Sequence, residues 1–81
     1  MKPQVTLYTR AGCHLCDEAK QAIAAAGARA EFDYREIDID GDPALRSRYN
    51  EEVPVVAING VKAFKYHVET KELLKKLEAR G

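Results

Sequence analysis

The sequence has no apolar run long enough to cross a membrane. Its longest run, residues 53–58, has six residues and includes a proline, whereas a transmembrane helix needs about 20 residues. The first residues also lack the apolar core of a secretory signal. These absences predict a cytoplasmic protein without a membrane partner.

The chain also has no excess of either charge. Thirteen basic and thirteen acidic side chains cancel at pH 7, so the broad basic face that binds nucleic acid or an anionic membrane is missing. Hydrophobic residues still make up 46% of the 81 residues, which excludes the composition of a disordered chain. We therefore expect one globular domain over residues 1–81, a monomer with no nucleic-acid partner.

Four short segments have the composition of β-strands, and no repeat or linker interrupts the chain. We predict strands at residues 4–9, 32–39, 55–58 and 61–66. The last two flank Asn59-Gly60, the strongest short-range signal for a two-residue hairpin turn with positive φ at both positions. The apolar phase slips within residues 32–39, as it does in a strand whose sheet is covered on both faces.

Three segments between and after these strands have helical spacing of apolar residues. The first covers residues 14–26, and we expect Gly27 to end it. The second starts at Asp42, the N-cap, with Pro43 in its first turn, and ends before Asn50. The third carries Leu73, Leu74 and Leu77, and we expect an ion pair between Glu72 and Lys76 on its surface.

The order of these elements, βαβαββα, predicts an α/β fold. A strand, helix and strand at the start imply a right-handed parallel crossover, and the final hairpin must join the same sheet antiparallel to it. The result is a four-stranded mixed sheet with strand order 2-1-3-4. The first and third helices cover one face and the short helix covers the other, which makes a three-layer α/β/α sandwich.

The two cysteines, Cys13 and Cys16, are too few for the disulfide framework of a small secreted domain, so we interpret them as a reactive pair. Cys13 lies where the first strand ends and the first helix begins, and the free N–H groups there favour a thiolate. These groups lower the pKa of a cysteine thiol from its usual value of about 8.5. Arg10 and His14 act in the same direction, whereas Asp17 and Glu18 oppose it.

One helical turn separates the two cysteines, so their Cα atoms should lie about 5–6 Å apart, within the range of a disulfide. Cys13 can then attack a substrate disulfide, and Cys16 can resolve the mixed disulfide. A structural zinc site is an alternative, but only His14 and His67 could complete its ligands. Two inert buried thiols are the other alternative.

Pro54 opens a strand that the sheet order places in the interior, where a residue without an N–H needs a reason. A cis bond after Val53 would turn the Val53 backbone outward, able to pair with an extended peptide beside the cysteines. A trans proline that only ends the preceding loop is the alternative.

Three features together resemble the glutaredoxins of the thioredoxin superfamily: the segment Tyr8-Thr9-Arg10-Ala11-Gly12-Cys13-His14-Leu15-Cys16, then Val53-Pro54, then the Asn59-Gly60 hairpin. The resemblance implies a thioredoxin-like fold and a dithiol–disulfide oxidoreductase without a prosthetic group. It implies that Cys13 is the nucleophile, Cys16 the resolving thiol and Pro54 cis, and that Arg10 meets a glutathione carboxylate. The substrate-binding residues that we expect are Arg10, His14, Val53, Pro54 and Lys65.

The partners implied are a disulfide-containing protein or small thiol as substrate, and glutathione or a reductase as electron donor. An iron–sulfur carrier is a second hypothesis, in which Cys13 from two chains and two external thiols hold a [2Fe–2S] cluster. A non-catalytic module that binds an extended peptide in the Pro54 groove is a third.

The glutathione site is where the sequence departs from the glutaredoxin pattern. Phe64 and Lys65 stand where Gly-Gly usually allows close approach of the γ-glutamyl end, and Glu52 adds negative charge. Lys65 could compensate only as a point charge. We therefore expect low turnover with glutathionylated substrates, improved when Phe64 and Lys65 are both changed to glycine.

Overall fold

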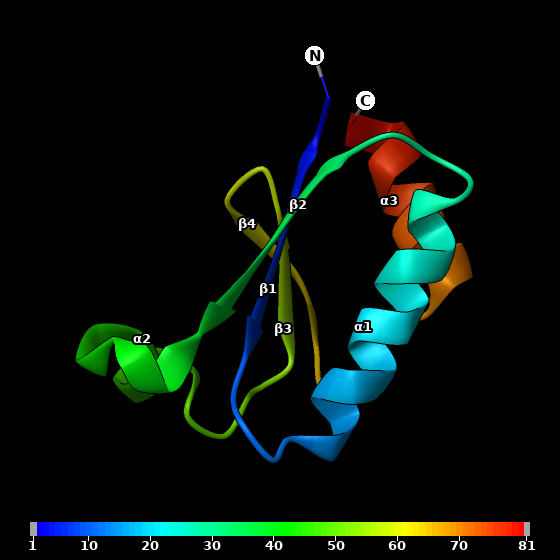
Figure 1. The fold of residues 1–81 in the computed structure, drawn as a ribbon. Helices are drawn as coiled ribbons and strands as arrows, with labels where there is room; N and C mark the ends of the chain where they lie inside the picture. The colour runs from blue at the N-terminus through cyan, green and yellow to red at the C-terminus, as the bar shows by residue number, and fades with distance from the viewer. Residues whose placement is uncertain (1, 81) are drawn as a thin grey trace.

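A single four-stranded sheet organises the chain. The computed structural model describes residues 2–80, and Figure 1 shows the order of the elements along them. They are β1 (Gln4–Thr9), α1 (His14–Gly27), β2 (Asp33–Asp38), the 3₁₀ turn η1 (Ile39–Gly41), α2 (Pro43–Tyr49), β3 (Val55–Ile58), β4 (Val61–Lys65) and α3 (Thr70–Arg80).

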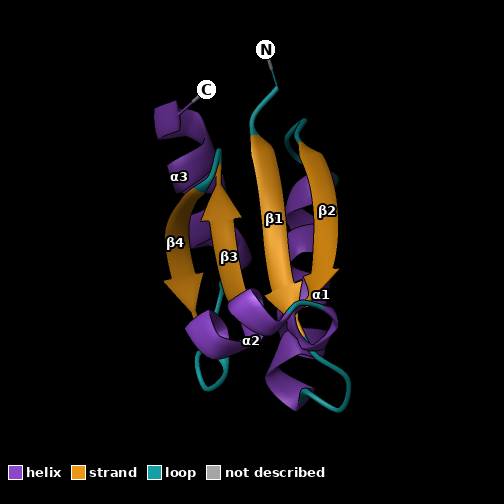
Figure 2. Cartoon of the chain, turned by 90° about the vertical axis from the view of Figure 1, so that its left-hand side faces the viewer, coloured by secondary structure: helices purple, strands orange, loops and turns teal. Residues whose placement is uncertain are grey.

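The strands lie in the order β2-β1-β3-β4, as the sequence predicts. β1 is parallel to β2 and antiparallel to β3, and β3 is antiparallel to β4. The arrowheads of β1 and β2 in Figure 2 point toward the same end of the sheet, where α2 lies and α1 begins. Residues that follow these two strands are therefore brought together at that end.

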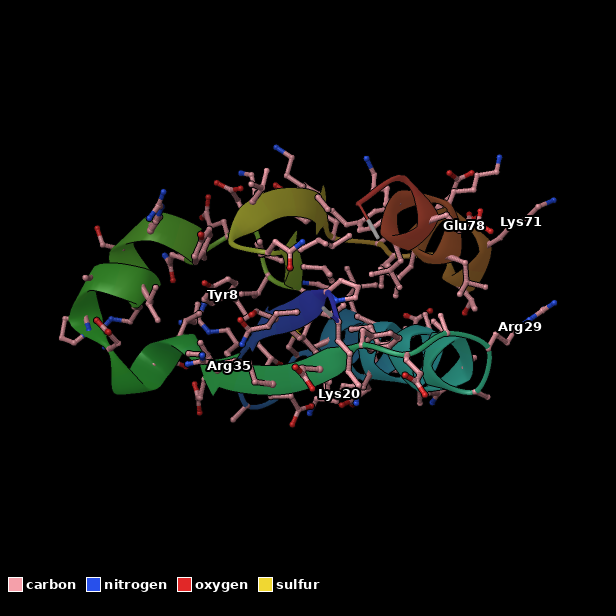
Figure 3. All side chains as sticks on the ribbon, turned by 90° about the horizontal axis from the view of Figure 1, so that it is seen from above. Tyr8, Lys20, Arg29, Arg35, Lys71 and Glu78 are labelled. Atoms are coloured by element: carbon pink, nitrogen blue, oxygen red, sulfur yellow. A yellow bond between two sulfur atoms is a disulfide. The ribbon has the colours of Figure 1, made fainter. Side chains whose placement is uncertain are left out.

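The two faces of the sheet are covered as predicted, by α1 and α3 on one side and by α2 on the other (Figure 1). The larger core lies under α1 and α3, and its buried residues are Val5, Leu7, Ala19, Ile23, Ala26, Val56, Ile58, Leu73 and Leu77. A smaller core beneath α2 is made by Ile39, Tyr49 and Val55. Tyr8 lies on the α2 side of β1 (Figure 3), and its ring centroid is 4.7 Å from that of Tyr49. The fold is a three-layer α/β/α sandwich.

β2 differs from its prediction. Five of its six residues are exposed and only Ile37 is half-buried, so the strand is not covered on both faces. β2 lies at the edge of the sheet, so it has a neighbouring strand on one side only. On the sheet face that α2 covers, the helix lies only near the end toward which β1 and β2 point (Figure 2). The slip in apolar phase therefore reflects an edge strand rich in charge.

One local prediction about the helices is confirmed and one is wrong. Gly27 is the last residue of α1, as expected, and the cap is Ala28, which stays right-handed with φ −77° and donates its N–H to the carbonyls of Ala25 and Ala26. No left-handed glycine is needed. On α3, the ammonium of Lys76 lies 5.6 Å from the centre of the Phe64 ring and no ion pair joins it to Glu72 within residues 2–80.

The hairpin between β3 and β4 has the predicted turn, because Asn59 and Gly60 have φ of 51° and 84°. The Asn59 side chain also accepts a hydrogen bond from the Gln4 N–H at 2.9 Å. β4 stops at Lys65, one residue earlier than predicted, since Tyr66 adopts a φ of 69° that ends the strand. No helix within residues 2–80 combines the length and apolar character that a membrane crossing requires.

Candidate active site

A tight turn after β1 delivers Cys13 to the start of α1. The Cys13 N–H donates to the Arg10 carbonyl at 3.3 Å, and Gly12, the third residue of this turn, has φ 77°. A side chain at Gly12 would be strained at that φ, so the glycine lets the chain turn sharply. The nucleophile predicted from the sequence therefore lies at the junction between a central strand and the first helix.

Cys13 is the N-cap of α1. Its backbone is extended, and its Sγ accepts a hydrogen bond from the Cys16 N–H at 3.1 Å. This contact satisfies one of the free N–H groups at the helix start. In the reduced protein, the same donor and the positive end of the helix favour a thiolate at Cys13, and Asp17 in the first turn opposes it.

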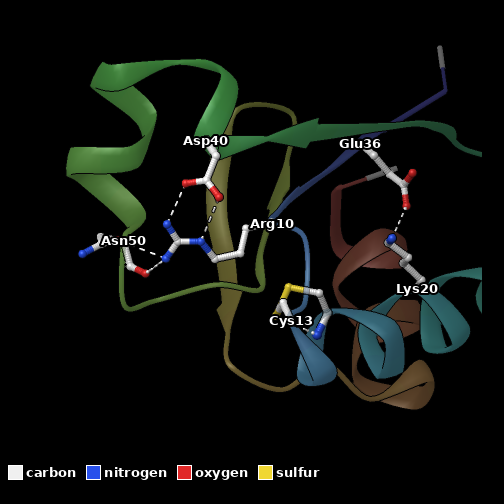
Figure 4. Close-up of a disulfide and its surroundings, with 7 residues drawn as sticks. Arg10, Cys13, Lys20, Glu36, Asp40 and Asn50 are labelled. Carbon is white, nitrogen blue, oxygen red and sulfur yellow. Dashed lines mark hydrogen bonds and ion pairs between the residues drawn. A yellow bond between two sulfur atoms is a disulfide. The ribbon is translucent and has the colours of Figure 1, made fainter.

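Cys13 and Cys16 form a disulfide (Figure 4), and their Cα atoms lie 5.2 Å apart, as predicted. Their surroundings differ. The Cys16 side chain is buried with 1% exposure, whereas Cys13 is only half-buried. An incoming sulfur can therefore reach Cys13 far more easily than Cys16. This asymmetry is what an attacking and a resolving cysteine require, and their roles stay a prediction.

The Val53–Pro54 peptide bond, immediately before β3, is cis. Because Tyr8 pairs with Val55 in antiparallel register, Pro54 and Val53 lie beside the end of β1 that leads into the cysteine turn. Pro54 is buried and Val53 half-buried. Within residues 2–80, the Val53 backbone makes no hydrogen bond. Its N–H and carbonyl are therefore free to pair with an extended peptide.

Arg10 is engaged by two neighbouring segments. Its Nε donates to Asp40 Oδ2 at 3.2 Å and its Nη2 to Asp40 Oδ1 at 2.6 Å, while Nη1 donates to the Asn50 carbonyl at 2.8 Å and to Asn50 Oδ1 at 3.0 Å. The hydrogen bond between Arg10 and Asp40 raises the pKa of the guanidinium and lowers the pKa of the carboxyl. The expected carboxylate-binding residue thus already holds a carboxylate of its own chain.

The other two predicted binding residues, His14 and Lys65, belong to different elements. His14 is exposed and is the first residue of α1, directly after Cys13. Lys65 ends β4, which β3 separates from β1. Its ammonium lies 5.5 Å from the centre of the Tyr66 ring, and it lines a shallow cavity of about 450 Å³ with Arg48, Glu51 and other residues near the end of α2. Among the described residues, no hydrogen bond or ion pair joins Lys65 to the cysteines, and its place in a substrate site stays a prediction.

Phe64 also has a role that the sequence does not reveal. Its half-buried ring packs against the core beneath α1 and α3, so changing it to glycine removes core packing as well as bulk. The backbone conformation that favours glycine occurs instead at Tyr66, with φ 69°. There the His67 N–H donates to the Lys65 carbonyl and the Tyr66 N–H to the Pro54 carbonyl, both at 2.8 Å. Tyr66 is therefore tied to the proline beside the site.

Sequence reasoning missed three residues near the site: Asp40, Asn50 and Tyr66. A signal for Asp40 exists, because parallel strands end at the same edge of a sheet and an acidic residue after β2 must lie near Arg10 after β1. Nothing in the sequence singles out Asn50 or Tyr66. Across residues 2–80, no three His, Cys, Asp or Glu side chains are grouped as ligands for a metal ion.

One cavity lies away from the cysteines. It measures about 720 Å³ and lies between the residues that follow α1 and α3, with Leu74 and Leu77 among its lining residues. Arg29, Lys71 and Glu78 lie along it (Figure 3).

Comparison with known proteins identifies the family to which this chain is similar. Residues 4–78 match the family model described as "Glutaredoxin-like domain (DUF836)". Uncharacterized protein Rv0508 of Mycobacterium tuberculosis is 38% identical over 64 residues, which cover 73% of this chain and 66% of that protein. The chain thus spans slightly less than two thirds of the length of this curated relative.

Solved structures agree with the fold. Protein XcR50 from X. campestris is 37% identical, with a TM-score of 0.76 over 93% of this chain and 96% of that one. Protein Ne2328 from Nitrosomonas europaea is 26% identical, with a TM-score of 0.82 over 95% and 93% of the two chains. Desulfothioredoxin from Desulfovibrio vulgaris Hildenborough, 22% identical with a TM-score of 0.72 over 100% of this chain and 83% of that one, shares the fold. The predicted thioredoxin-like fold is confirmed.

Proposed function

We propose that this chain, which belongs to the glutaredoxin-like domain family, is a dithiol–disulfide oxidoreductase that reduces protein or small-molecule disulfides. The observation that carries the proposal is the Cys13–Cys16 disulfide at the start of α1, with Cys16 buried and Cys13 accessible. A pair held only for structure would gain nothing from a sulfur exposed at a helix N-terminus.

The reaction starts from the dithiol. The Cys13 thiolate attacks one sulfur of the substrate disulfide, that S–S bond breaks, and the other substrate sulfur leaves as a thiolate that takes up a proton. Cys16 then loses its proton and attacks Cys13 in the mixed disulfide, and the first substrate sulfur leaves as a thiol. The substrate gains two electrons from the protein and two protons, one from Cys16 and one from solvent that replaces the proton Cys13 released as it became a thiolate, and the protein is left as the disulfide seen in Figure 4.

Substrate docking is the part of the proposal that uses Val53 and Pro54. The unpaired Val53 N–H and carbonyl lie beside the cysteine turn, where an extended polypeptide can add two main-chain hydrogen bonds. Such main-chain contacts hold a substrate sulfur near Cys13 and do not depend on the side chains of the substrate. A polypeptide is thus the substrate class that this backbone suits best.

The cycle needs an electron donor for the Cys13–Cys16 disulfide. A low-molecular-weight thiol such as glutathione, or a disulfide reductase, can supply the two electrons. Either donor fits the cytoplasmic location expected from the sequence, because glutathione and thioredoxin systems keep protein cysteines there in the thiol form.

The test is reduction of insulin disulfides by the purified protein, with dithiothreitol, glutathione or a thioredoxin reductase as donor in separate assays. We expect catalysis above the uncatalysed rate with at least one donor, and none with Cys13→Ser. Cys13→Ser and Cys16→Ser are matched substitutions within one motif, so a difference between them reports the two roles. Failure of the wild type with all donors, together with peptide binding that survives loss of both cysteines, would instead favour a non-catalytic binding module.

A further inference from the structure

The charge of Arg10 is neutralised within the protein. All three nitrogens of the guanidinium donate, Nε and Nη2 to Asp40 and Nη1 to two oxygens of Asn50. Figure 4 shows the guanidinium directed toward η1 and the end of α2, away from Cys13. The paired Nε and Nη2 donors that would bind a second carboxylate in bidentate fashion are therefore already used by Asp40.

We propose that Asp40 is a specificity-determining residue, which withholds Arg10 from the carboxylates of anionic substrates. The inference rests on the proposed disulfide exchange at Cys13. It deepens that function by naming the substrate class: disulfides in polypeptide segments without negative charge are preferred over mixed disulfides of an anionic tripeptide such as glutathione.

The charges around the cysteine turn support this preference. Arg10 is the cation of the turn that positions Cys13, three residues before it. With its charge balanced by Asp40, the side chains that remain nearby include the exposed carboxylates of Asp17 and Glu18 in the first helical turns. These repel a substrate that carries two carboxylates and do not repel an uncharged or basic segment.

The alternative is that Asp40 only holds the segments together. Arg10 connects the end of β1 to η1 and to the residue after α2, and loss of that connection could disturb the cysteine turn. Such a structural role would change reduction of every substrate to the same degree. A specificity role would change the ratio between an anionic and a non-anionic substrate.

The experiment therefore compares two mixed disulfides of one peptide, with glutathione, which carries two carboxylates, and with cysteamine, which carries none. The ratio of their kcat/KM values is measured for the wild type, Asp40→Ala and the double variant Arg10→Gln/Asp40→Ala. Glu36→Gln is the matched control, because Glu36 is another half-exposed carboxylate that pairs with a cation, Lys20, away from the site.

We expect Asp40→Ala to raise the glutathione-to-cysteamine ratio about two- to fivefold, the range of one added contact between a carboxylate and an arginine near the surface. The ratio should stay at the wild-type value in Glu36→Gln and should return toward it in the double variant. An unchanged ratio in Asp40→Ala overturns the proposal. So does an equal loss on both substrates, or a gain that persists without Arg10.

Binding tests the same residue without turnover. S-methylglutathione carries the carboxylates of glutathione but cannot exchange, and its Kd can be measured by NMR titration of each variant. We expect tighter binding to Asp40→Ala than to the wild type, and no such gain without Arg10. If the wild type reduces neither mixed disulfide, the proposed function fails, while this titration still supports or overturns the role of Asp40.

Discussion

Replacement of Thr9 by valine is expected to stabilise the protein. Thr9 is the last residue of β1 and is 8% exposed, on the side of the sheet that also buries Val5 and Leu7. Its Oγ1 is buried and has no hydrogen-bond partner among the described residues. Valine has nearly the same shape, favours strands and carries no polar atom.

The size of the effect follows from the cost of burying an unpaired hydroxyl, which is about 1–3 kcal/mol. We expect Thr9→Val to raise the free energy of unfolding by about 1 kcal/mol, at the lower end because the hydroxyl lies near a strand end. For a domain of this size, 1 kcal/mol raises Tm by about 4–8 °C.

The assay is thermal and urea unfolding of the oxidised protein, with the Cys13–Cys16 disulfide intact in every variant. Thr9→Ser is the control, because it keeps the hydroxyl and removes the methyl group, and we expect it to be less stable than the wild type by about 1 kcal/mol. A Thr9→Val variant that is no more stable than the wild type would refute the reasoning, because the hydroxyl must then be satisfied.

Three further predictions concern the site. Cys13→Ser should abolish disulfide reduction, while Cys16→Ser should accumulate mixed disulfides because only resolution is lost; equal trapping in both variants would show that the roles are wrongly assigned. The hydrogen bond from Arg10 lowers the pKa of Asp40, so its contribution to stability is present above the ordinary value of about 3.9 and is lost as pH falls through the lowered value. The Tm difference between the wild type and Asp40→Asn should therefore shrink from pH 7 to about pH 2, and a constant difference would contradict the ion pair. Tyr66→Gly should be more stable than Tyr66→Ala by about 1 kcal/mol, since φ 69° strains any residue with a β-carbon; an alanine variant of equal stability would show that the backbone relaxes.

Much of the fold could be predicted because the signals are local. Asn59-Gly60 specifies its turn through two positive φ angles, and Asp42 with Pro43 caps α2, where the Asp42 side chain accepts from the Ala44 N–H. The cysteine turn belongs to the same class, since strand end, glycine and helix start are adjacent in the sequence. For such features the sequence pattern and the physical cause lie within a few residues.

The predictions that were wrong concern features that depend on tertiary contacts. Lys76 finds the Phe64 ring on β4 rather than Glu72 on its own helix, and the exposure of β2 depends on how far α2 reaches across the sheet. Phe64 occupies a position where the family resemblance suggests glycine, yet the direction of its side chain into the core depends on the irregular register of β4 beside Val56 and Ala57. None of these contacts leaves a periodic trace in the sequence.

The same distinction separates two parts of the candidate function. The reactivity of Cys13 depends on its own turn and on one N–H of α1, so it is expected wherever the motif occurs at a strand-to-helix junction. What Arg10 can bind depends on Asp40 and Asn50, which are supplied by the segments after β2 and α2. Similarity over the cysteine motif alone therefore cannot settle substrate preference. If Asp40 acts as proposed, relatives that share the motif but lack an acidic residue after β2 should differ from this protein in their use of glutathione and agree with it in the chemistry of the cysteine pair.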